Sequence, residues 1–131
     1  IVSSGRPYRV GLCHCLDCRK HHGALFHASA IFPQDAVTID GETRDYAGRY
    51  FCPRCGSPIA FEAEAKWPGE VHLYHGTLAD PSAFVPTAHV HTGEQVAWFE
   101  VHDDLPRFET SGRGSKPQRH GPRLEDRRGS A

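Results

Sequence analysis

The chain has 131 residues, a length typical of one domain. Hydrophobic residues make up 38% and charged residues 24%, which is the composition of a globular protein. No segment approaches the roughly 20 apolar residues of a membrane-spanning helix, and the first residues lack the basic and apolar regions of a signal peptide. We therefore expect a soluble, cytoplasmic protein with no membrane partner.

The formal net charge of -1 conceals a basic C-terminal segment. Residues 111–131 carry a formal charge of +4, so the rest of the chain carries -5. The segment is rich in Gly, Pro and Ser and has almost no apolar residues, a composition more typical of a disordered segment than of a nucleic-acid-binding surface. We predict a disordered basic tail over residues 110–131 and expect no nucleic-acid partner.

Short segments rich in β-branched and aromatic residues, separated by turn residues, predict a mainly β protein. The predicted strands cover residues 8–12, 28–32, 36–39, 59–61, 70–75 and 96–101. Only the residues from Asp17 to His22 favour a helix. In the last predicted strand, Trp98 and Phe99 follow the pattern of core residues, so we expect packing in the core rather than stacking on a substrate.

The five cysteines indicate metal binding rather than disulfides. Five is an odd number, and the spacings Cys13-x-Cys15-x-x-Cys18 and Cys52-x-x-Cys55 are typical of zinc sites. Thiols remain available as metal ligands in a reducing cytosol. We therefore expect zinc as the cofactor.

The first cysteine cluster has the pattern of a reactive site. Side chains alternate along a strand, so Cys13 and Cys15 should face one side and His14 the other, where a packing role is expected. With Cys18 returning through a turn, three thiolates could hold one zinc and leave the fourth position for water or substrate. Such a site suits a soft thiol ligand. The neighbouring Arg19 could pair with a substrate carboxylate.

The second cysteine pair leaves an alternative open. The segment from Cys52 to Gly56 has the form of a zinc knuckle, but two cysteines do not close a zinc site. Cys15, Cys18, Cys52 and Cys55 could instead form one closed four-cysteine zinc ribbon, with Cys13 as a spare. That arrangement would make the chain a non-catalytic binding module. The spacing does not distinguish the two arrangements.

Several motifs resemble one known family. Residues 11–20, with Gly23 and Phe26, resemble the C-H-C-x-x-C-R signature of the glutathione-dependent formaldehyde-activating (GFA) family, whose domain is also described as a centromere protein V/GFA-type domain. Further segments continue the resemblance, which spans about Tyr8 to Glu109. These segments are residues 50–58, 75–81, 86, 89–98 and 104–108.

The resemblance implies a fold and two zinc sites. The fold is a small β domain of two sheets, called a β-tent, which we expect over residues 1–109. Cys13, Cys15 and Cys18 would hold a reactive zinc. Cys52 and Cys55 would share a structural zinc with an earlier C-x-C motif. No C-x-C precedes Cys13 and the sequence does not begin with Met, so we expect that motif upstream of Ile1.

The resemblance also implies an activity. Members of this family join glutathione and formaldehyde into S-hydroxymethylglutathione, so the chain would be a carbon-sulfur lyase with these two small-molecule partners. Cys13, Cys15 and Cys18 would be the catalytic residues, and we expect Arg19 to bind the substrate because it adjoins Cys18. The open thiolate site inferred from the cysteine spacing favours the same kind of ligand, a thiol.

Overall fold

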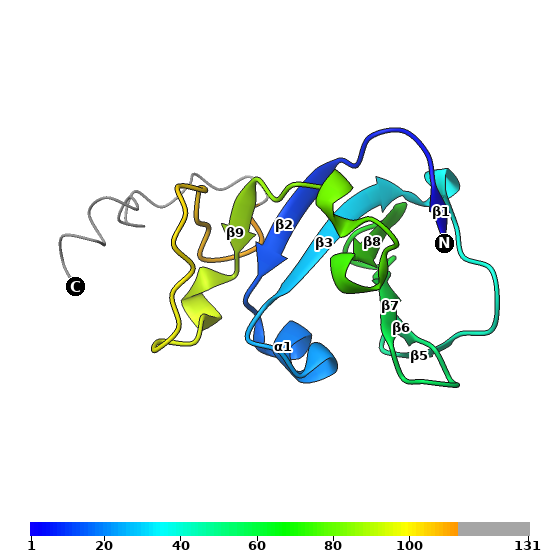
Figure 1. Ribbon diagram of the computed structural model, residues 1–131, viewed down its shortest axis with the longest axis horizontal. Coiled ribbons are helices and arrows are strands. Elements are labelled where there is room, and N and C mark those ends of the chain that lie inside the picture. The colour runs from blue at the N-terminus through cyan, green and yellow to red at the C-terminus, as the bar shows by residue number, and fades with distance from the viewer. Residues whose placement is uncertain (113–131) are drawn as a thin grey trace. The chain divides into compact units, whose positions relative to one another are not determined.

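The computed structural model describes residues 1–112, which form mainly short strands (Figure 1). These residues fall into two compact units, each built from two separate stretches of chain. The first unit comprises residues 1–10 and 28–86. The second comprises residues 11–27 and, among the described residues, 87–112. Most of the predicted tail, from residue 113 onward, lies outside the described residues.

The first unit is built on antiparallel strands. A short pair joins β1 (Val2–Ser3) to β4 (Val37–Thr38). A longer run of hydrogen-bonded neighbours has the order β5-β6-β7-β8-β3. Its members are β5 (Arg44–Tyr46), β6 (Arg49–Phe51), β7 (Pro58–Phe61), β8 (Glu70–Tyr74) and β3 (His27–Pro33). Short 3-10 turns complete the unit: η1 (Gln34–Ala36), η2 (His75–Thr77) and η3 (Pro81–Ala83).

The hydrophobic core of the first unit centres on strand β8. Alternation along this strand buries Val71 and Leu73 on one face. Ala30 and Ala60 lie opposite Leu73 on the two neighbouring strands, and their small side chains leave room for it. Phe32 joins the same core cluster. This core stabilises the sheet by removing apolar surface from water.

The second unit contains the only α-helix among residues 1–112. Strand β2 (Arg9–Cys13) enters this unit at Gly11 and pairs in parallel with β9 (Ala88–Val90). Helix α1 (Leu16–His22) begins three residues after β2, and η4 (Thr92–Glu94) follows β9. The chain then returns beside β9, where the His89 N–H donates to the Pro106 carbonyl and the Phe108 N–H to the His89 carbonyl.

The predicted fold class is confirmed: the structure is mainly β, with two open sheets and a few short helical turns. Helix α1 and five of the six predicted strands are present, within one or two residues at their ends. The strand predicted over residues 96–101 is wrong. That segment forms a loop, in which the Gln95 side chain donates to the Phe99 carbonyl. Strands β1, β5, β6 and β9 were not predicted.

Within residues 1–112, no helix is both long and apolar enough to span a bilayer.

Candidate metal centre

Three cysteines of the second unit converge at the junction between β2 and α1. Cys13 is the last residue of β2, and Cys15 is the N-cap of the helix in an extended conformation, with φ -66° and ψ 153°. Cys18 lies one turn into α1, and its N–H donates to the Cys15 sulfur at 3.4 Å. Gly23 ends the helix in the left-handed conformation, with φ 65°. The strand end and the helix start thereby direct the three side chains to one place.

The geometry of this cysteine cluster fits zinc. The sulfur atoms of Cys13, Cys15 and Cys18 all lie within 4.8 Å of one another. Tetrahedral zinc, bound at about 2.3 Å, would hold sulfurs roughly 3.8 Å apart. A closing movement of about 1 Å or less between sulfurs would therefore bring the set to zinc geometry. Sulfur donors favour soft metals, and three of them leave one tetrahedral position for another ligand.

The three thiols differ in charge and exposure. Contacts with the sulfurs of Cys15 and Cys18, followed by burial, raise the pKa of Cys13 far above its ordinary value. Hydrogen bonds from Cys13 and Cys18 lower the pKa of Cys15 far below its ordinary value. Cys15 is also the most exposed of the three. The metal-free cluster thus carries its first negative charge on Cys15, and ligation would release the remaining protons.

Cys52 and Cys55 lie on the turn between β6 and β7 in the first unit. The Gly56 N–H donates to the Cys52 carbonyl at 2.7 Å, and Gly56 has φ 78°, which favours glycine. Cys55 is exposed, and a hydrogen bond with the Ser57 hydroxyl lowers its pKa. This turn has the form predicted for a zinc knuckle. It offers two of the four ligands that a closed zinc site needs.

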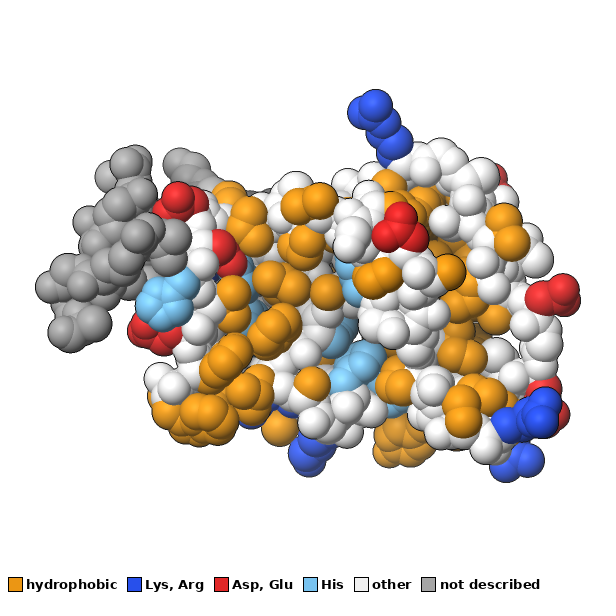
Figure 2. Space-filling view, in the orientation of Figure 1, with side chains coloured by type: hydrophobic (Ala, Val, Ile, Leu, Met, Phe, Trp, Pro, Cys, Tyr) orange, Lys and Arg blue, Asp and Glu red, His pale blue; other side chains and the backbone are white. Residues whose placement is uncertain are grey.

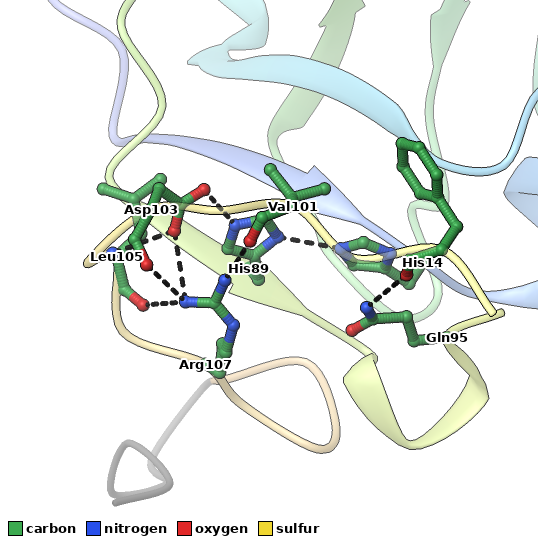
Figure 3. Close-up of polar contacts among 8 residues, drawn as sticks. His14, His89, Gln95, Val101, Asp103, Leu105 and Arg107 are labelled. Atoms are coloured by element: carbon green, nitrogen blue, oxygen red, sulfur yellow. Dashed lines mark hydrogen bonds and ion pairs between the residues drawn. The ribbon is translucent and has the colours of Figure 1, made fainter. Parts of the chain in front are cut away.

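A buried chain of side chains starts between the first two cysteines. His14 Nε2 lies 2.8 Å from His89 Nδ1, and His89 Nε2 lies 2.8 Å from Asp103 Oδ2 (Figure 3). Both imidazoles are only 1% exposed. Burial, with smaller contributions from His89 and Arg107, lowers the pKa of His14 to about 4. His14 is therefore neutral at pH 7.

Arg107 anchors the far end of this chain. Its Nη1 lies 3.1 Å from Asp103 Oδ1 and donates to the Leu105 carbonyl at 2.7 Å, while Nη2 donates to the Val101 carbonyl at 2.8 Å. Asp103 Oδ1 also accepts the Leu105 N–H at 3.0 Å. Burial alone would raise the pKa of Asp103, but the hydrogen bonds from His89 and Leu105 outweigh it and hold that pKa below its ordinary value.

Arg19 has one partner that its sequence position did not reveal. Its Nη2 donates to the Glu94 carbonyl at 3.0 Å, and the Glu94 carboxylate accepts the Leu16 N–H at 3.4 Å. Arg19 Nε is buried and has no hydrogen-bond partner among residues 1–112. The guanidinium is thus held beside the cysteine-bearing helix with part of its donor capacity unused.

Trp98 and Phe99 were both predicted to pack in the core, and the structure places them differently. Phe26 contacts the His14 ring at 5.5 Å between centroids, and Phe99 stacks on Phe26 at 6.1 Å. Trp98 is 77% exposed, so its predicted core position is wrong. Hydrophobic side chains reach the surface at several other places as well (Figure 2).

Sequence reasoning missed the contributions of His89, Asp103 and Arg107. His89 has no ligand-like spacing to the cysteines, and it lies 75 positions from His14. Only the tertiary fold brings the two residues together. The nearest available signal was the resemblance of residues 89–98 and 104–108 to a family's closing segment, which gave no role to any of these side chains.

The fold and the site define a mainly β protein in which three cysteine sulfurs lie close enough together to hold a metal ion. The particular family follows from comparison. Residues 1–94 match the family model described as glutathione-dependent formaldehyde-activating enzyme, so the chain belongs to this family. A search of curated proteins found no match.

Proposed function

We propose that this chain is a zinc-dependent carbon-sulfur lyase that joins glutathione to formaldehyde. The observation that carries the proposal is the convergence of the Cys13, Cys15 and Cys18 sulfurs within 4.8 Å, in a chain of the glutathione-dependent formaldehyde-activating enzyme family. Free thiols of this kind persist in reducing surroundings, which supports a cytoplasmic location.

The proposed reaction needs no oxidant or reductant. The glutathione sulfur attacks the formaldehyde carbon, a carbon-sulfur bond forms, and the carbon-oxygen double bond becomes a single bond. The proton lost by the thiol ends on the new hydroxyl group, and the product is S-hydroxymethylglutathione. Zinc, when bound, supplies a Lewis-acidic position at which a thiol ionises near neutral pH.

The residues of the chain have distinct roles in this proposal. The reactive metal is held by Cys13, Cys15 and Cys18. Cys15 is the most exposed of the three, so the substrate approaches from its side. Arg19 binds a glutathione carboxylate through the guanidinium N–H groups that Glu94 does not use. Cys52 and Cys55 contribute two ligands to a separate structural zinc.

The activity is tested by following exchange between free and adduct-bound formaldehyde by NMR, because the uncatalysed addition is itself appreciable. The zinc-loaded protein should accelerate exchange, and Cys15→Ser should lose most of that acceleration. The control is Ser82→Ala, at an exposed residue of the other unit that has no role in the proposal, and it should retain the acceleration. Calorimetric titration of glutathione tests binding separately. The proposed substrates are wrong if the zinc-loaded protein neither binds glutathione nor changes the exchange rate.

A closed four-cysteine ribbon remains the alternative, and Cys13 distinguishes the two. The ribbon uses Cys15, Cys18, Cys52 and Cys55, so Cys13→Ser would leave its zinc affinity unchanged. The proposed reactive site uses Cys13 as a ligand, so the same substitution should weaken zinc binding at that site. Zinc content per chain and competition with a colorimetric chelator measure the difference.

A further inference from the structure

We propose that His14, His89 and Asp103 form a directional hydrogen-bond chain that positions Cys13 and Cys15 for metal binding. The inference rests on the metal-binding part of the proposed function and is independent of which thiol or aldehyde reacts. In this inference His14, His89 and Asp103 are positioning residues, because none of them is proposed to touch the substrate.

The direction of the chain follows from its carboxylate end. An ionised carboxylate only accepts hydrogen bonds, so the contact of 2.8 Å between Asp103 Oδ2 and His89 requires a proton on His89 Nε2. In a neutral imidazole the other nitrogen, Nδ1, is then an acceptor. The proton in the contact of 2.8 Å between the two imidazoles therefore belongs to His14 Nε2. His14 donates to His89, and His89 donates to Asp103.

The charges around the chain favour this neutral arrangement. Arg107 lies 3.1 Å from Asp103 and already balances its negative charge. A protonated His89 would add a second positive charge at a site where the imidazole is 1% exposed and the side chain of Arg107 only 9% exposed. Burial penalises such an uncompensated charge. In the proposed chain both imidazoles are neutral, and each carries its proton on Nε2.

The hydrogen-bond chain affects the orientation of Cys13 and Cys15 because His14 lies between them in the sequence. The His14 backbone N–H donates to the Val90 carbonyl of β9 at 3.1 Å, and the His14 ring donates to His89 of the same strand. These two bonds fix both the backbone and the side chain of His14 on β9. Since neighbouring side chains of extended backbone point to opposite sides, fixing His14 directs Cys13 and Cys15 to the other side, where their sulfurs meet.

The Asp103 and Arg107 end of the hydrogen-bond chain lies beyond the residues that the family model matches. His14 and His89 fall within the matched residues 1–94, whereas Asp103 and Arg107 follow them. Residues 101–107 are nevertheless tied together by the three carbonyls and one carboxylate that Arg107 contacts. This later segment therefore completes the support of the metal centre.

The decisive variant is Asp103→Asn, which keeps the shape of the side chain but reverses the direction of its hydrogen bond with His89. The amide oxygen can still accept from Leu105 and Arg107, as Oδ1 of Asp103 does. The amide NH₂ then faces His89 Nε2 and requires that nitrogen to accept. His89 must in turn carry its proton on Nδ1, and His14 must accept instead of donate. The matched control is Glu100→Gln, the same change in an exposed carboxylate that lies 3.8 Å from His102.

Two measurements test the inference. Nitrogen-15 NMR of the metal-free protein at pH 7 should show His14 and His89 as Nε2–H tautomers in the wild type and in Glu100→Gln, and as Nδ1–H tautomers in Asp103→Asn. Zinc release to a chelator should be about 10-fold or more faster from Asp103→Asn, by the usual effect of losing a residue that supports metal ligands. Glu100→Gln should release zinc at the wild-type rate.

The outcomes separate this inference from the proposed function and from a general loss of stability. If the wild type retains no zinc through Cys13, the proposed function fails, while the tautomers still test the chain. Unchanged tautomers or unchanged zinc release in Asp103→Asn overturn the inference. So does an equally faster release from Val71→Ala, a variant destabilised in the core of the first unit and outside the hydrogen-bond chain. If Asp103→Asn does not fold, His14→Phe, which keeps a ring but no donor, must release zinc faster for the inference to stand.

Discussion

Cys13, Cys15 and Cys18 are chemically unequal although they form one cluster. Two sulfur donors and the Cys18 N–H stabilise negative charge on Cys15, whereas hydrogen bonding and burial keep Cys13 protonated. The thiolate is the nucleophilic form of cysteine, and access to solvent also controls its reactivity. The cluster should therefore present one reactive sulfur rather than three.

Alkylation of the metal-free protein tests this inequality. Iodoacetamide at pH 7 should label Cys15 and the exposed Cys55 first and Cys13 last, as measured by peptide mass spectrometry. Raising the pH should increase the labelling of Cys13 but change that of Cys15 little, because Cys15 is already ionised at pH 7. Zinc loading should protect Cys15. Equal labelling rates at Cys13 and Cys15 would contradict the inequality.

Asp103 should make stability depend on pH in a defined direction. Its folded-state pKa is lowered, so its contribution is fully present above the unfolded value of about 3.9 and is lost as pH falls through the folded value. In the metal-free protein, Asp103→Asn should cost about 1–2 kcal/mol at pH 7. That difference should shrink towards pH 3. Urea unfolding of both proteins at several pH values measures it, and a constant difference would exclude the ionised carboxylate as its source.

The sequence predicted some individual residues well and others not at all. The spacing of Cys13, Cys15 and Cys18 was sufficient to predict their convergence, because all three contacts are local in the chain. The pairing of His14 with His89 was out of reach, since no local pattern encodes a contact between residues 75 positions apart. Trp98 was misplaced because its hydrophobicity predicts burial, whereas the loop around it leaves it exposed.

At the scale of elements, the predicted strands β3 and β8 carry the largest fully buried hydrophobic side chains. Val71 and Leu73 identify β8, and Ala30 and Phe32 identify β3. Strands β5 and β6 were missed because none of their residues is buried. Strand β9 has only three residues, and a pattern of that length is too short to interpret.

The turn between β5 and β6 allows a sharp test of element geometry. Ala47 and Gly48 both have positive φ, 50° and 81°, and the Gly48 N–H donates to the Asp45 carboxylate at 3.1 Å. A side chain costs roughly 1–2 kcal/mol in the left-handed region. Ala47→Gly should therefore raise the free energy of unfolding by about 0.5–1 kcal/mol, measured in urea, after the greater freedom of glycine in the unfolded chain is subtracted.

Replacing glycine by alanine at the next position, Gly48, should destabilise the protein, and positive φ is only one of two reasons. A Cβ atom on Gly48 would lie 2.0 Å from the backbone oxygen of Glu62, a contact that the side chain cannot avoid by rotation. Gly48→Ala should therefore destabilise the protein by several kcal/mol, well beyond the cost of positive φ alone. Equal stability of Gly48→Ala and the wild type would show that this turn has a different conformation in solution.

At the scale of the whole molecule, metal binding should raise the melting temperature. A ligand that binds only the folded state stabilises it by about 2.7 kcal/mol when present at 100 times its dissociation constant. Adding zinc to the metal-free protein should raise its melting temperature in calorimetry, and a chelator should reverse the gain. In a Cys13→Ser, Cys15→Ser, Cys18→Ser triple variant that gain should be reduced. A gain of wild-type size in this variant would place the stabilising zinc elsewhere.

The division of the chain into two units, each made of two separate stretches, has a consequence for synthesis. His89 lies 75 positions after His14 in the sequence. A ribosome adds about 5–20 residues per second, so His89 is synthesised about 4–15 seconds after His14. During that interval the nascent chain displays Cys13, Cys15 and Cys18 without the strand that supports them. Protection of these thiols on the ribosome must therefore come from reducing surroundings or from early metal capture, because the fold cannot yet provide it.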